Sequence, residues 1–372
     1  MITTPDTRIQ IAYCTDVAYV QHLAVAMASL FEHNPAAGLC VHVISPPLPE
    51  QSIARLDTVA RQYGTTLVYV PVDERVVASL REHMHISRAM YYRILLPKLV
   101  AVDKIIYFDC DMLMEADVTE LWNTDVEGVG CAGVDEENPA QVVRLGLTNG
   151  MYINSGTLVM NLAYWREHKI CERCMEWLEA NRAIAILPDQ DAINVVLHGH
   201  KRTVPLKWNL NPVPLDDIGV LSTYPSRVVH FGGPIKPWHR HYDFDLQALY
   251  KKYLDKTPWS TDFVLTEPGN TAQCLIVANQ YHARGHLGHA AHYYVRALQI
   301  RLLTDKLESE LLLDVINSAH RLTNSQRFDE ACALYRACFK HWSFPIDHLV
   351  NIYRVPGILR QVAAPTLAAA AT

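Results

Sequence analysis

Long apolar runs are missing from this sequence: no stretch of about 18 apolar residues occurs, so no membrane-spanning helix is expected. The first residues, MITTPDTRIQIAY, also lack the basic and apolar segments of a secretory leader. Charge of one sign does not accumulate either, because 33 Lys and Arg stand against 39 Asp and Glu and give a net charge of −6. We therefore expect a cytoplasmic protein that does not bind nucleic acid.

Cysteine and histidine motifs of structural metal sites are also scarce. The nine cysteines are an odd number at scattered spacings, which indicates reduced thiols rather than disulfides. Cys171 and Cys174 fall within an apparent helix at residues 165–180, and no second pair stands at zinc-finger spacing, so we interpret them as buried thiols. Four tail histidines at helical spacing are interpreted as an exposed helix face: His282, His286, His289 and His292.

One glycine pattern has the letters of a nucleotide-binding motif without its context. Residues 128–133 read GVGCAG, which matches GxGxxG. A dinucleotide fingerprint follows a strand and opens a helix, whereas this pattern leads into a strand-like run at residues 131–134. We therefore do not interpret it as a dinucleotide site.

What the sequence does contain is a regular alternation of strand-like and helix-like segments. With 372 residues and 50% hydrophobic content, the chain is large enough for two domains. The expected elements are a strand at 8–13, a helix at 20–31, a strand at 39–44, a helix at 50–63, a strand at 66–70, a helix at 90–99 and a strand at 104–108. This order predicts an α/β fold with a mostly parallel sheet covered by helices.

The pattern changes beyond residue 255, where helical segments follow a joint rich in proline and glycine. We expect a domain at residues 1–255 and a helical domain at residues 256–372. Within the tail, Leu287, Ala290, Tyr294 and Ala297 are repeated 41 residues later as Phe328, Ala331, Tyr335 and Cys338. The repeat fits either tetratricopeptide-like hairpins or ordinary helix packing through small residues.

Two acidic residues, Asp109 and Asp111, follow the strand expected at residues 104–108. Ligands of open α/β sheets bind at the carboxyl ends of strands. In an extended segment alternate side chains point the same way, so the two carboxylates would share one face and Cys110 would turn back into the protein. Such a pair can hold the divalent cation that neutralises a phosphate leaving group, although a solvated strand end is the more common explanation of an isolated pair.

The context for this pair is VVHFGGPIKPW at residues 228–238, where His230 can complete a metal site and Lys236 can bind a diphosphate. With both segments present, the sequence resembles glycosyltransferase family 8, which includes bacterial lipooligosaccharide galactosyltransferases, glycogenin and plant galactinol synthases. Residues 8–30, residues 85–111 and YINSG at 152–156 match as well. The resemblance spans roughly residues 8–245.

This resemblance implies a GT-A fold and a retaining reaction that moves a hexose, galactose or glucose, from a UDP-sugar to an acceptor. It also implies a Mn²⁺ or Mg²⁺ ion. By residue match, Asp109, Asp111 and His230 resemble the metal ligands of the family. Lys236 and Gly233 resemble its diphosphate-binding corner.

The resemblance extends to further donor-binding positions. Asp16 matches an acid that holds the uracil, and Arg93 matches an arginine that positions the donor. The resemblance implies that Tyr13, Cys14 and Thr15 contribute mainly backbone contacts and shape to the donor site. Cys110 and Ser155 also lie within the matching segments. The sequence departs from one common pattern at Ala18, where the family often has asparagine, so the ribose contacts are left open.

Asp135 and Asn154 match residues that contact the donor sugar's hydroxyls. The segment LPDQD at residues 187–191 matches the family's segment near the anomeric carbon. Gln190 is the candidate on the reacting face, in a front-face displacement or, alternatively, a covalent mechanism. Asp189 is expected to bind a sugar hydroxyl. Asp191 either joins it or caps a helix expected to begin after it.

Two other classes of function remain open: a catalytically silent sensor that binds nucleotide sugars, and a scaffold that acts through the helical tail. The tail could bind a protein partner, pair two subunits or shape the acceptor site. Peripheral membrane contact is a weak expectation, because the tail has no polybasic cluster. Trp208 and Asn209 also resemble the family, and we interpret Trp208 as an aromatic anchor that packs a loop.

Overall fold

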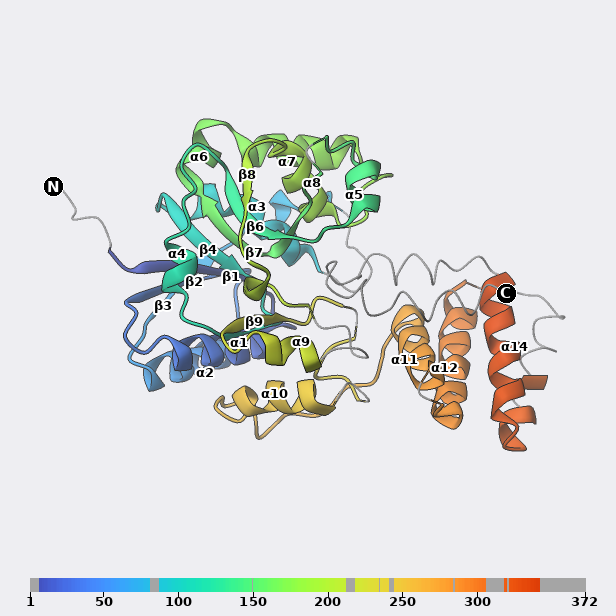
Figure 1. The fold of residues 1–372 in the computed structure, drawn as a ribbon. Helices are drawn as coiled ribbons and strands as arrows, with labels where there is room; N and C mark the ends of the chain where they lie inside the picture. Colours follow the sequence, from blue (N-terminus) through green and yellow to red (C-terminus); the bar gives the residue numbers. More distant parts are fainter. Residues whose placement is uncertain are drawn as a thin grey trace.

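A seven-stranded sheet forms the centre of the first two thirds of the chain (Figure 1). The computed structural model describes residues 7–80, 87–148, 150–211, 218–233, 235–240, 244–283, 285–305, 318–319 and 321–341. The strands of the sheet are β1 (Ile9–Cys14), β2 (Leu39–Ser45), β3 (Leu67–Pro71), β4 (Lys104–Phe108), β6 (Cys131–Asp135), β7 (Ile153–Asn161) and β8 (Lys201–Thr203). Their order across the sheet is β3-β2-β1-β4-β7-β6-β8.

Strand direction makes this a mixed sheet. β1 runs parallel to β2 and β4, and β2 runs parallel to β3. β7 runs antiparallel to both of its neighbours, β4 and β6, and β8 is parallel to β6. The mostly parallel α/β sheet predicted from the sequence is confirmed. Because β7 runs the other way, its first residues lie at the same edge as the last residues of β4 and β6.

Helices cover both faces of the sheet (Figure 1). On one face, Ile11 and Tyr13 of β1 belong to the core that contains α1 (Val20–His33) and α2 (Glu50–Gln62). On the other, Ala12 and Cys14 pack in a core with α3 (Tyr92–Leu99), which follows a 3-10 turn at Arg88–Tyr91. Since both faces are covered, every residue of β1 is buried, which explains its nearly continuous apolar run.

The second face also carries α6 (Leu162–Glu167), α7 (Ile170–Ala180) and α8 (Pro188–Val196). The single helix expected at residues 165–180 was wrong, because Lys169 adopts a left-handed conformation, with φ of 52°, that separates α6 from α7. Cys171 and Cys174 are buried in α7, as expected. The shorter helices are α4 (Thr119–Trp122), α5 (Pro139–Arg144) and α9 (Ile218–Thr223), with 3-10 turns at Glu74–Val76 and Leu206–Trp208.

A second, two-stranded sheet brings distant parts of the chain together. β5 (Met112–Glu115) pairs antiparallel with β9 (Arg227–His230), and Met112 lies opposite His230. The backbone N–H of Phe231 donates to the carbonyl oxygen of Asp111 at 2.9 Å. This register places the end of β9 directly beside the two acidic residues that follow β4.

The last helix before residue 255 is α10 (Phe244–Leu254), which packs against α1. The chain beyond residue 255 first stays on the sheet domain, where Lys256 pairs with Glu32 at 2.7 Å and Asp262 with Arg55 at 2.5 Å. The apolar core that contains α1 also includes residues of α11 (Thr271–Ala283) and α12 (Leu287–Asp305). The division into domains at residue 255 therefore stays a prediction.

Three tail helices, α11, α12 and α14 (Phe328–His341), lie side by side in Figure 1. The repeated positions whose side chains are described are mostly buried in α12 and α14, and the rings of Tyr294 and Tyr335 stack at 6.2 Å. The side chain of Cys338 lies outside the described residues. The tetratricopeptide-like interpretation stays a prediction. Of the four tail histidines expected on an exposed face, His286, His289 and His292 are exposed, whereas His282 is half-buried. Within the described ranges, no helix combines the length and apolar character needed to cross a bilayer.

Candidate active site

One cleft opens at the edge of the large sheet where β1, β4 and β6 end and β7 begins. The residues of this cleft that the sequence predicted are Cys14, Thr15, Asp16, Arg93, Asp109, Cys110, Asp111, Asp135, Asn154, Ser155, Asp189, Gln190, His230 and Lys236. Two predicted residues do not line it. Tyr13 is fully buried with its hydroxyl 3.9 Å from Met114 Sδ, and Gly232 rather than Gly233 faces the cleft.

Asp109 and Asp111 lie in a tight turn between β4 and β5. We expected them on an extended segment, which was wrong, because β5 begins immediately at Met112 and the chain must turn between the two strands. The turn still presents both carboxylates to the cleft. The thiol of Cys110 points inward and donates to the carbonyl oxygen of Cys14 at 3.2 Å.

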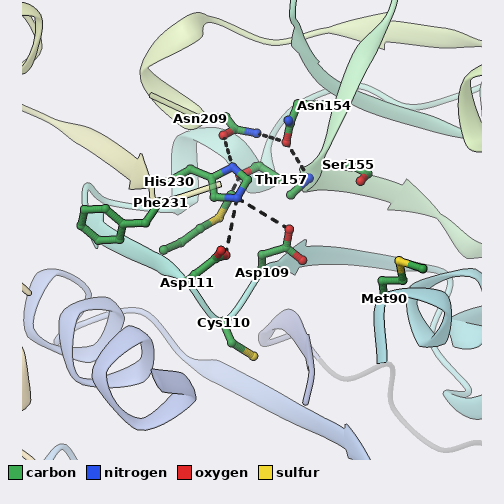
Figure 2. Close-up of polar contacts among 12 residues, drawn as sticks. Met90, Asp109, Cys110, Asp111, Asn154, Ser155, Thr157, Asn209, His230 and Phe231 are labelled. Atoms are coloured by element: carbon green, nitrogen blue, oxygen red, sulfur yellow. Dashed lines mark hydrogen bonds and ion pairs between the residues drawn. The ribbon is translucent and has the colours of Figure 1, made fainter. Parts of the chain in front are cut away.

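His230 lies against this turn, and the side-chain amide of Asn209 orients its ring (Figure 2). Its Nδ1 is 2.8 Å from Asn209 Oδ1. Its Nε2 is 3.5 Å from Asp111 Oδ1 and 3.8 Å from Asp109 Oδ2. Gly156 makes room for the ring, because a Cβ at this position would lie 2.6 Å from His230 Cε1.

These three side chains fit a divalent cation. One ligand atom each of Asp109, Asp111 and His230 lies within 4.8 Å of the others. Two carboxylate oxygens and one imidazole nitrogen suit Mn²⁺, while Mg²⁺ prefers an oxygen shell. The bond from His230 Nδ1 to Asn209 leaves Nε2 facing the carboxylates, which is the usual arrangement of a metal-binding histidine.

Lys236 supplies a buried positive charge next to this group. Its ammonium, in a residue that is 4% exposed, donates to Asp111 Oδ2 and to the carbonyl oxygen of Phe231, both at 2.6 Å. Burial alone would raise the pKa of Asp111, but Lys236 and His230 outweigh it and hold that pKa well below its usual range. Asp111 is therefore ionised and available as an anionic ligand at neutral pH.

Arg93 connects the acidic turn to α8. Its guanidinium lies 2.8 Å from Asp109 Oδ1 and 3.1 Å from Asp189 Oδ2, and it also donates to the carbonyl and hydroxyl oxygens of Ser155 at 2.8 and 2.9 Å. Burial disfavours the charge of Arg93, but Asp109 together with Tyr107 and Asp189 offsets it, so the pKa of Arg93 is raised. The arginine thus stays charged and holds three elements around the cleft.

The far end of the cleft is a connected set of polar side chains. Glu136 Oε1 accepts hydrogen bonds from Asn154 Nδ2 at 2.6 Å and from Gln190 Nε2 at 3.1 Å. Gln190 Oε1 accepts from the backbone N–H of Ser155 at 2.9 Å. Asp135 Oδ1 accepts from backbone N–H groups, including that of Tyr152 at 3.2 Å. Burial raises the pKa of Glu136 to about 7, although the bonds from Asn154 and Gln190 lower it.

Asp191 has a structural role. Its carboxylate is fully buried and accepts from Tyr152 Oη at 2.6 Å, from Arg144 at 2.7 Å and from the backbone N–H of Ile186 at 2.8 Å. α8 begins at Pro188, so the expectation that a helix starts after Asp191 was wrong. The carboxylate instead fixes the loop that enters α8.

Asp16 lies at the opposite end of the cleft, where both of its oxygens already have partners. Oδ1 accepts from the backbone N–H of Tyr19 at 3.0 Å, and Oδ2 accepts from Ser87 Oγ at 2.6 Å. Thr15 and Cys14 lie beside it at the end of β1. His85, at the start of a matching segment, lies outside the described residues.

Sequence reasoning missed several residues of this site. Glu136 follows Asp135 at the end of β6, and its place at a strand end is the signal that could have found it. Asn209 was considered only beside an aromatic anchor, and Ser87 was not considered. Asn194 bonds to both backbone groups of Ile153 at 2.8 Å and so fixes α8 to β7, which no local pattern reveals.

The fold and this cleft define a GT-A glycosyltransferase. A crystal structure of the galactosyltransferase LgtC with donor and acceptor sugar analogues is similar, with a TM-score of 0.61 and 25% identity over 67% of this chain and 96% of that chain. The model of the family named Glycosyl transferase family 8 matches residues 10–242. The chain therefore belongs to glycosyl transferase family 8, which confirms the resemblance seen in the sequence.

Curated relatives show the same membership. General stress protein A of Bacillus subtilis (strain 168) is 26% identical over 69% of this chain and 96% of its own length. The lipopolysaccharide 1,2-glucosyltransferase of Escherichia coli (strain K12) is 25% identical over 68% of this chain and 80% of its own. The lipopolysaccharide 1,3-galactosyltransferase of Salmonella typhimurium (strain LT2) is 24% identical over 80% of this chain and 92% of its own.

Proposed function

We propose that this protein is a metal-dependent, retaining hexosyltransferase that moves galactose or glucose from a UDP-sugar to a hydroxyl of a saccharide or other acceptor. The observation that carries the proposal is the convergence of Asp109, Asp111 and His230 in one cleft with Lys236. Relatives named as lipopolysaccharide glucosyl- and galactosyltransferases support a hexose donor and a saccharide acceptor. A cytoplasmic location and a role in carbohydrate biosynthesis belong to the same proposal.

The basic side chains of the cleft suit the diphosphate end of the donor. A Mn²⁺ or Mg²⁺ ion held by the two aspartates and His230 would supply positive charge to the diphosphate as it leaves. Lys236 is positioned by Asp111 to bind a phosphate oxygen, and it needs little rearrangement because its ammonium is already desolvated. The uridine would lie toward Asp16, Thr15 and Cys14, at the other wall of the cleft.

The polar set at the far end suits the hexose. Gln190 is held at both ends of its carboxamide, by Ser155 and by Glu136. A neutral amide in this position is a weak nucleophile but a well-fixed dipole, which supports a front-face displacement. In that reaction the acceptor oxygen bonds to the anomeric carbon on the side from which the phosphate oxygen departs, and the acceptor proton passes to that oxygen. Asp135, Asn154 and Asp189 would then bind sugar hydroxyls.

The first experiment follows donor hydrolysis by NMR with purified protein, Mn²⁺ and a panel of UDP-sugars. The expected result is metal-dependent release of UDP from one donor with retained configuration, and its loss in an Asp109→Asn, Asp111→Asn double variant. Calorimetry with UDP and Mn²⁺ accompanies it. Binding of UDP without turnover, even with acceptor saccharides present, would favour the silent sensor, and failure to bind UDP at all would refute the donor site.

Three further proposals concern contacts that the protein makes outside the cleft. Peripheral contact with a membrane, a protein partner for the helical tail, and self-association through the tail all stay predictions. Vesicle flotation and analytical ultracentrifugation of the full chain test them directly.

A further inference from the structure

Glu136 is a half-buried acid for which no role was predicted, and it lies at the far end of the cleft in contact with both Asn154 and Gln190. It follows Asp135 at the end of β6. One of its two carboxylate oxygens, Oε1, accepts hydrogen bonds from both Asn154 Nδ2, at 2.6 Å, and Gln190 Nε2, at 3.1 Å. Above its pKa of about 7, Glu136 is a carboxylate that can only accept hydrogen bonds, so both amides turn their NH₂ groups toward it. The acid therefore fixes the polarity of two separate hydrogen-bond chains.

The first hydrogen-bond chain sets the orientation of the Gln190 carboxamide. Since its NH₂ group faces Glu136, its carbonyl oxygen must face the backbone N–H of Ser155, where the distance is 2.9 Å. A flipped amide would place its oxygen against the carboxylate and its NH₂ against an N–H donor. Both contacts would be repulsive, so the orientation follows from the chemistry of the partners.

The second chain leads to His230. Asn154 gives its NH₂ to Glu136 and therefore offers its oxygen to Asn209 Nδ2, at 2.7 Å. Asn154 Oδ1 also accepts from the backbone N–H of Gly156 at 2.8 Å, which holds it in the same orientation. Asn209 is then left with its oxygen toward His230 Nδ1, at 2.8 Å, and Nδ1 must carry the proton (Figure 2).

The consequence lies on the opposite side of the ring. A neutral imidazole carries one proton, so a protonated Nδ1 leaves Nε2 with its lone pair. Nε2 is the atom that faces Asp111 Oδ1 at 3.5 Å and Asp109 Oδ2 at 3.8 Å. A ring protonated on Nε2 instead would present a proton where a metal ion needs a ligand.

We propose that Glu136 is a positioning residue that sets both the carboxamide orientation of Gln190 and, through Asn154 and Asn209, the metal-binding tautomer of His230. The inference deepens the proposed function and rests on it for its purpose. The hydrogen-bond chain itself can be tested without metal or donor. Because one oxygen makes both contacts, a glutamine at position 136 supplies the same acceptor, whereas an apolar side chain of similar length does not.

The test compares Glu136→Met, Glu136→Gln and, as a matched control, Glu137→Met at the exposed neighbouring glutamate. Histidine labelled with ¹⁵N reports the ring nitrogens of the metal-free proteins at alkaline pH, and a His230→Asn variant assigns the signal. The expected result is Nδ1–H in the wild type, in Glu136→Gln and in the control, and a gain of the Nε2–H form in Glu136→Met. An unchanged tautomer in Glu136→Met would overturn the proposal.

Calorimetric titration with Mn²⁺ in the presence of UDP gives a second readout. Loss of an outer partner of a metal ligand typically costs 10- to 100-fold in metal affinity, so we expect about that loss in Glu136→Met and recovery of most of it in Glu136→Gln. Equal losses in both variants would mean that the charge of Glu136, rather than its acceptor oxygen, matters, and would overturn the relay.

Two further comparisons keep the outcomes separate. If Glu136→Met does not fold, Asn209→Ala interrupts only the branch to His230 and is expected to shift the tautomer while the Gln190 contacts stay in place. If the wild-type protein binds neither UDP nor Mn²⁺, the proposed function fails, but the ¹⁵N signals of the metal-free protein still decide whether Glu136 sets the tautomer.

Discussion

The imidazole of His22 lies stacked on the indole of Trp238, with ring centroids 3.4 Å apart and an interplanar angle of 14°. His22 belongs to α1, and Trp238 follows Lys236 by two residues on the loop after β9. His22 Nδ1 is also 2.7 Å from the hydroxyl of Tyr250 in α10. The stack therefore fixes the loop that carries Lys236 onto α1, the first helix of the chain.

Because of His22, the free energy of unfolding is expected to fall as the pH drops from 6.5 to about 3. Burial lowers the pKa of His22 from 6.5 to about 3, although Asp111 raises it, and Lys236 and His239 lower it further. Between these values the unfolded chain binds a proton that the folded chain does not. The contribution of uncharged His22 to the free energy of unfolding is therefore complete above pH 6.5. It is lost as pH falls, at up to about 1.4 kcal/mol per pH unit.

Chemical denaturation of the wild type and of His22→Phe over this pH range measures the effect. The phenyl ring can keep the stack but cannot titrate, so the free energy of unfolding of the variant should fall less steeply below pH 6.5. The variant also leaves the Tyr250 hydroxyl without the ring nitrogen, so it should be less stable at neutral pH. Parallel pH profiles of the two proteins would show that His22 is not the titrating group.

Much of the sheet could be predicted from the sequence, because its strands are buried on both faces and appear as apolar runs. The runs at residues 39–44 and 104–108 match β2 and β4 within a residue. The split between α6 and α7 could not be predicted, since Lys169 has no sequence preference for the left-handed conformation it adopts. Its conformation is a consequence of tertiary packing.

Only part of the candidate site could be predicted from the sequence, for the same reason. Asp109, Asp111, His230 and Lys236 could be recognised because residue type and local order carry their chemistry. The role of Asp191 could not, because its partners Tyr152 and Arg144 come from distant segments. The same holds for Asn209 and Glu136, whose function lies in which atom faces which partner. Hydrogen-bond direction across several elements is not encoded in any short motif.

A methyl group at position 156 is expected to disable the proposed metal site. In Gly156→Ala the new Cβ would lie 2.6 Å from His230 Cε1 and 2.7 Å from Met112 Cε, so the imidazole must move. We expect a loss of Mn²⁺ affinity of about 10- to 100-fold, similar to other changes that disturb a metal ligand. Calorimetry with UDP and Mn²⁺ measures it.

Gly38→Ala is the matched control, because a Cβ there would meet only Arg8 Cγ at 3.5 Å, an ordinary contact. It should bind Mn²⁺ like the wild type. If Gly156→Ala also bound Mn²⁺ normally, the close approach of β7 to His230 would have no functional meaning.

Replacement of Arg93 should affect folding and turnover together. Arg93→Lys keeps the charge but cannot span Asp109, Asp189 and Ser155, since an ammonium lacks the planar set of donors of a guanidinium. We expect a clear loss of kcat/KM in this variant. Arg93→Met should in addition lose about 3 to 5 kcal/mol of unfolding free energy, because the buried carboxylate of Asp189 and the half-buried carboxylate of Asp109 lose their partner. Activity assays and urea unfolding measure the two effects, and a fully active Arg93→Lys would contradict the bridging role.

Asp189 and Asp191 are two residues apart in α8, and their substitutions should have opposite consequences. Asp191→Asn is expected to lose about 2 to 4 kcal/mol of stability, because Asp191 is fully buried and a neutral amide cannot accept all the bonds from Tyr152, Arg144 and Ile186. Burial raises the pKa of Asp189 despite the opposing charge of Arg93, so the charged form is disfavoured in the fold and Asp189→Asn should cost little stability. Its main effect should be lower turnover of the UDP-sugar. Thermal unfolding and donor hydrolysis, measured on both variants, test these two roles. A stable but inactive Asp191→Asn together with an unstable but active Asp189→Asn would reverse the two assignments.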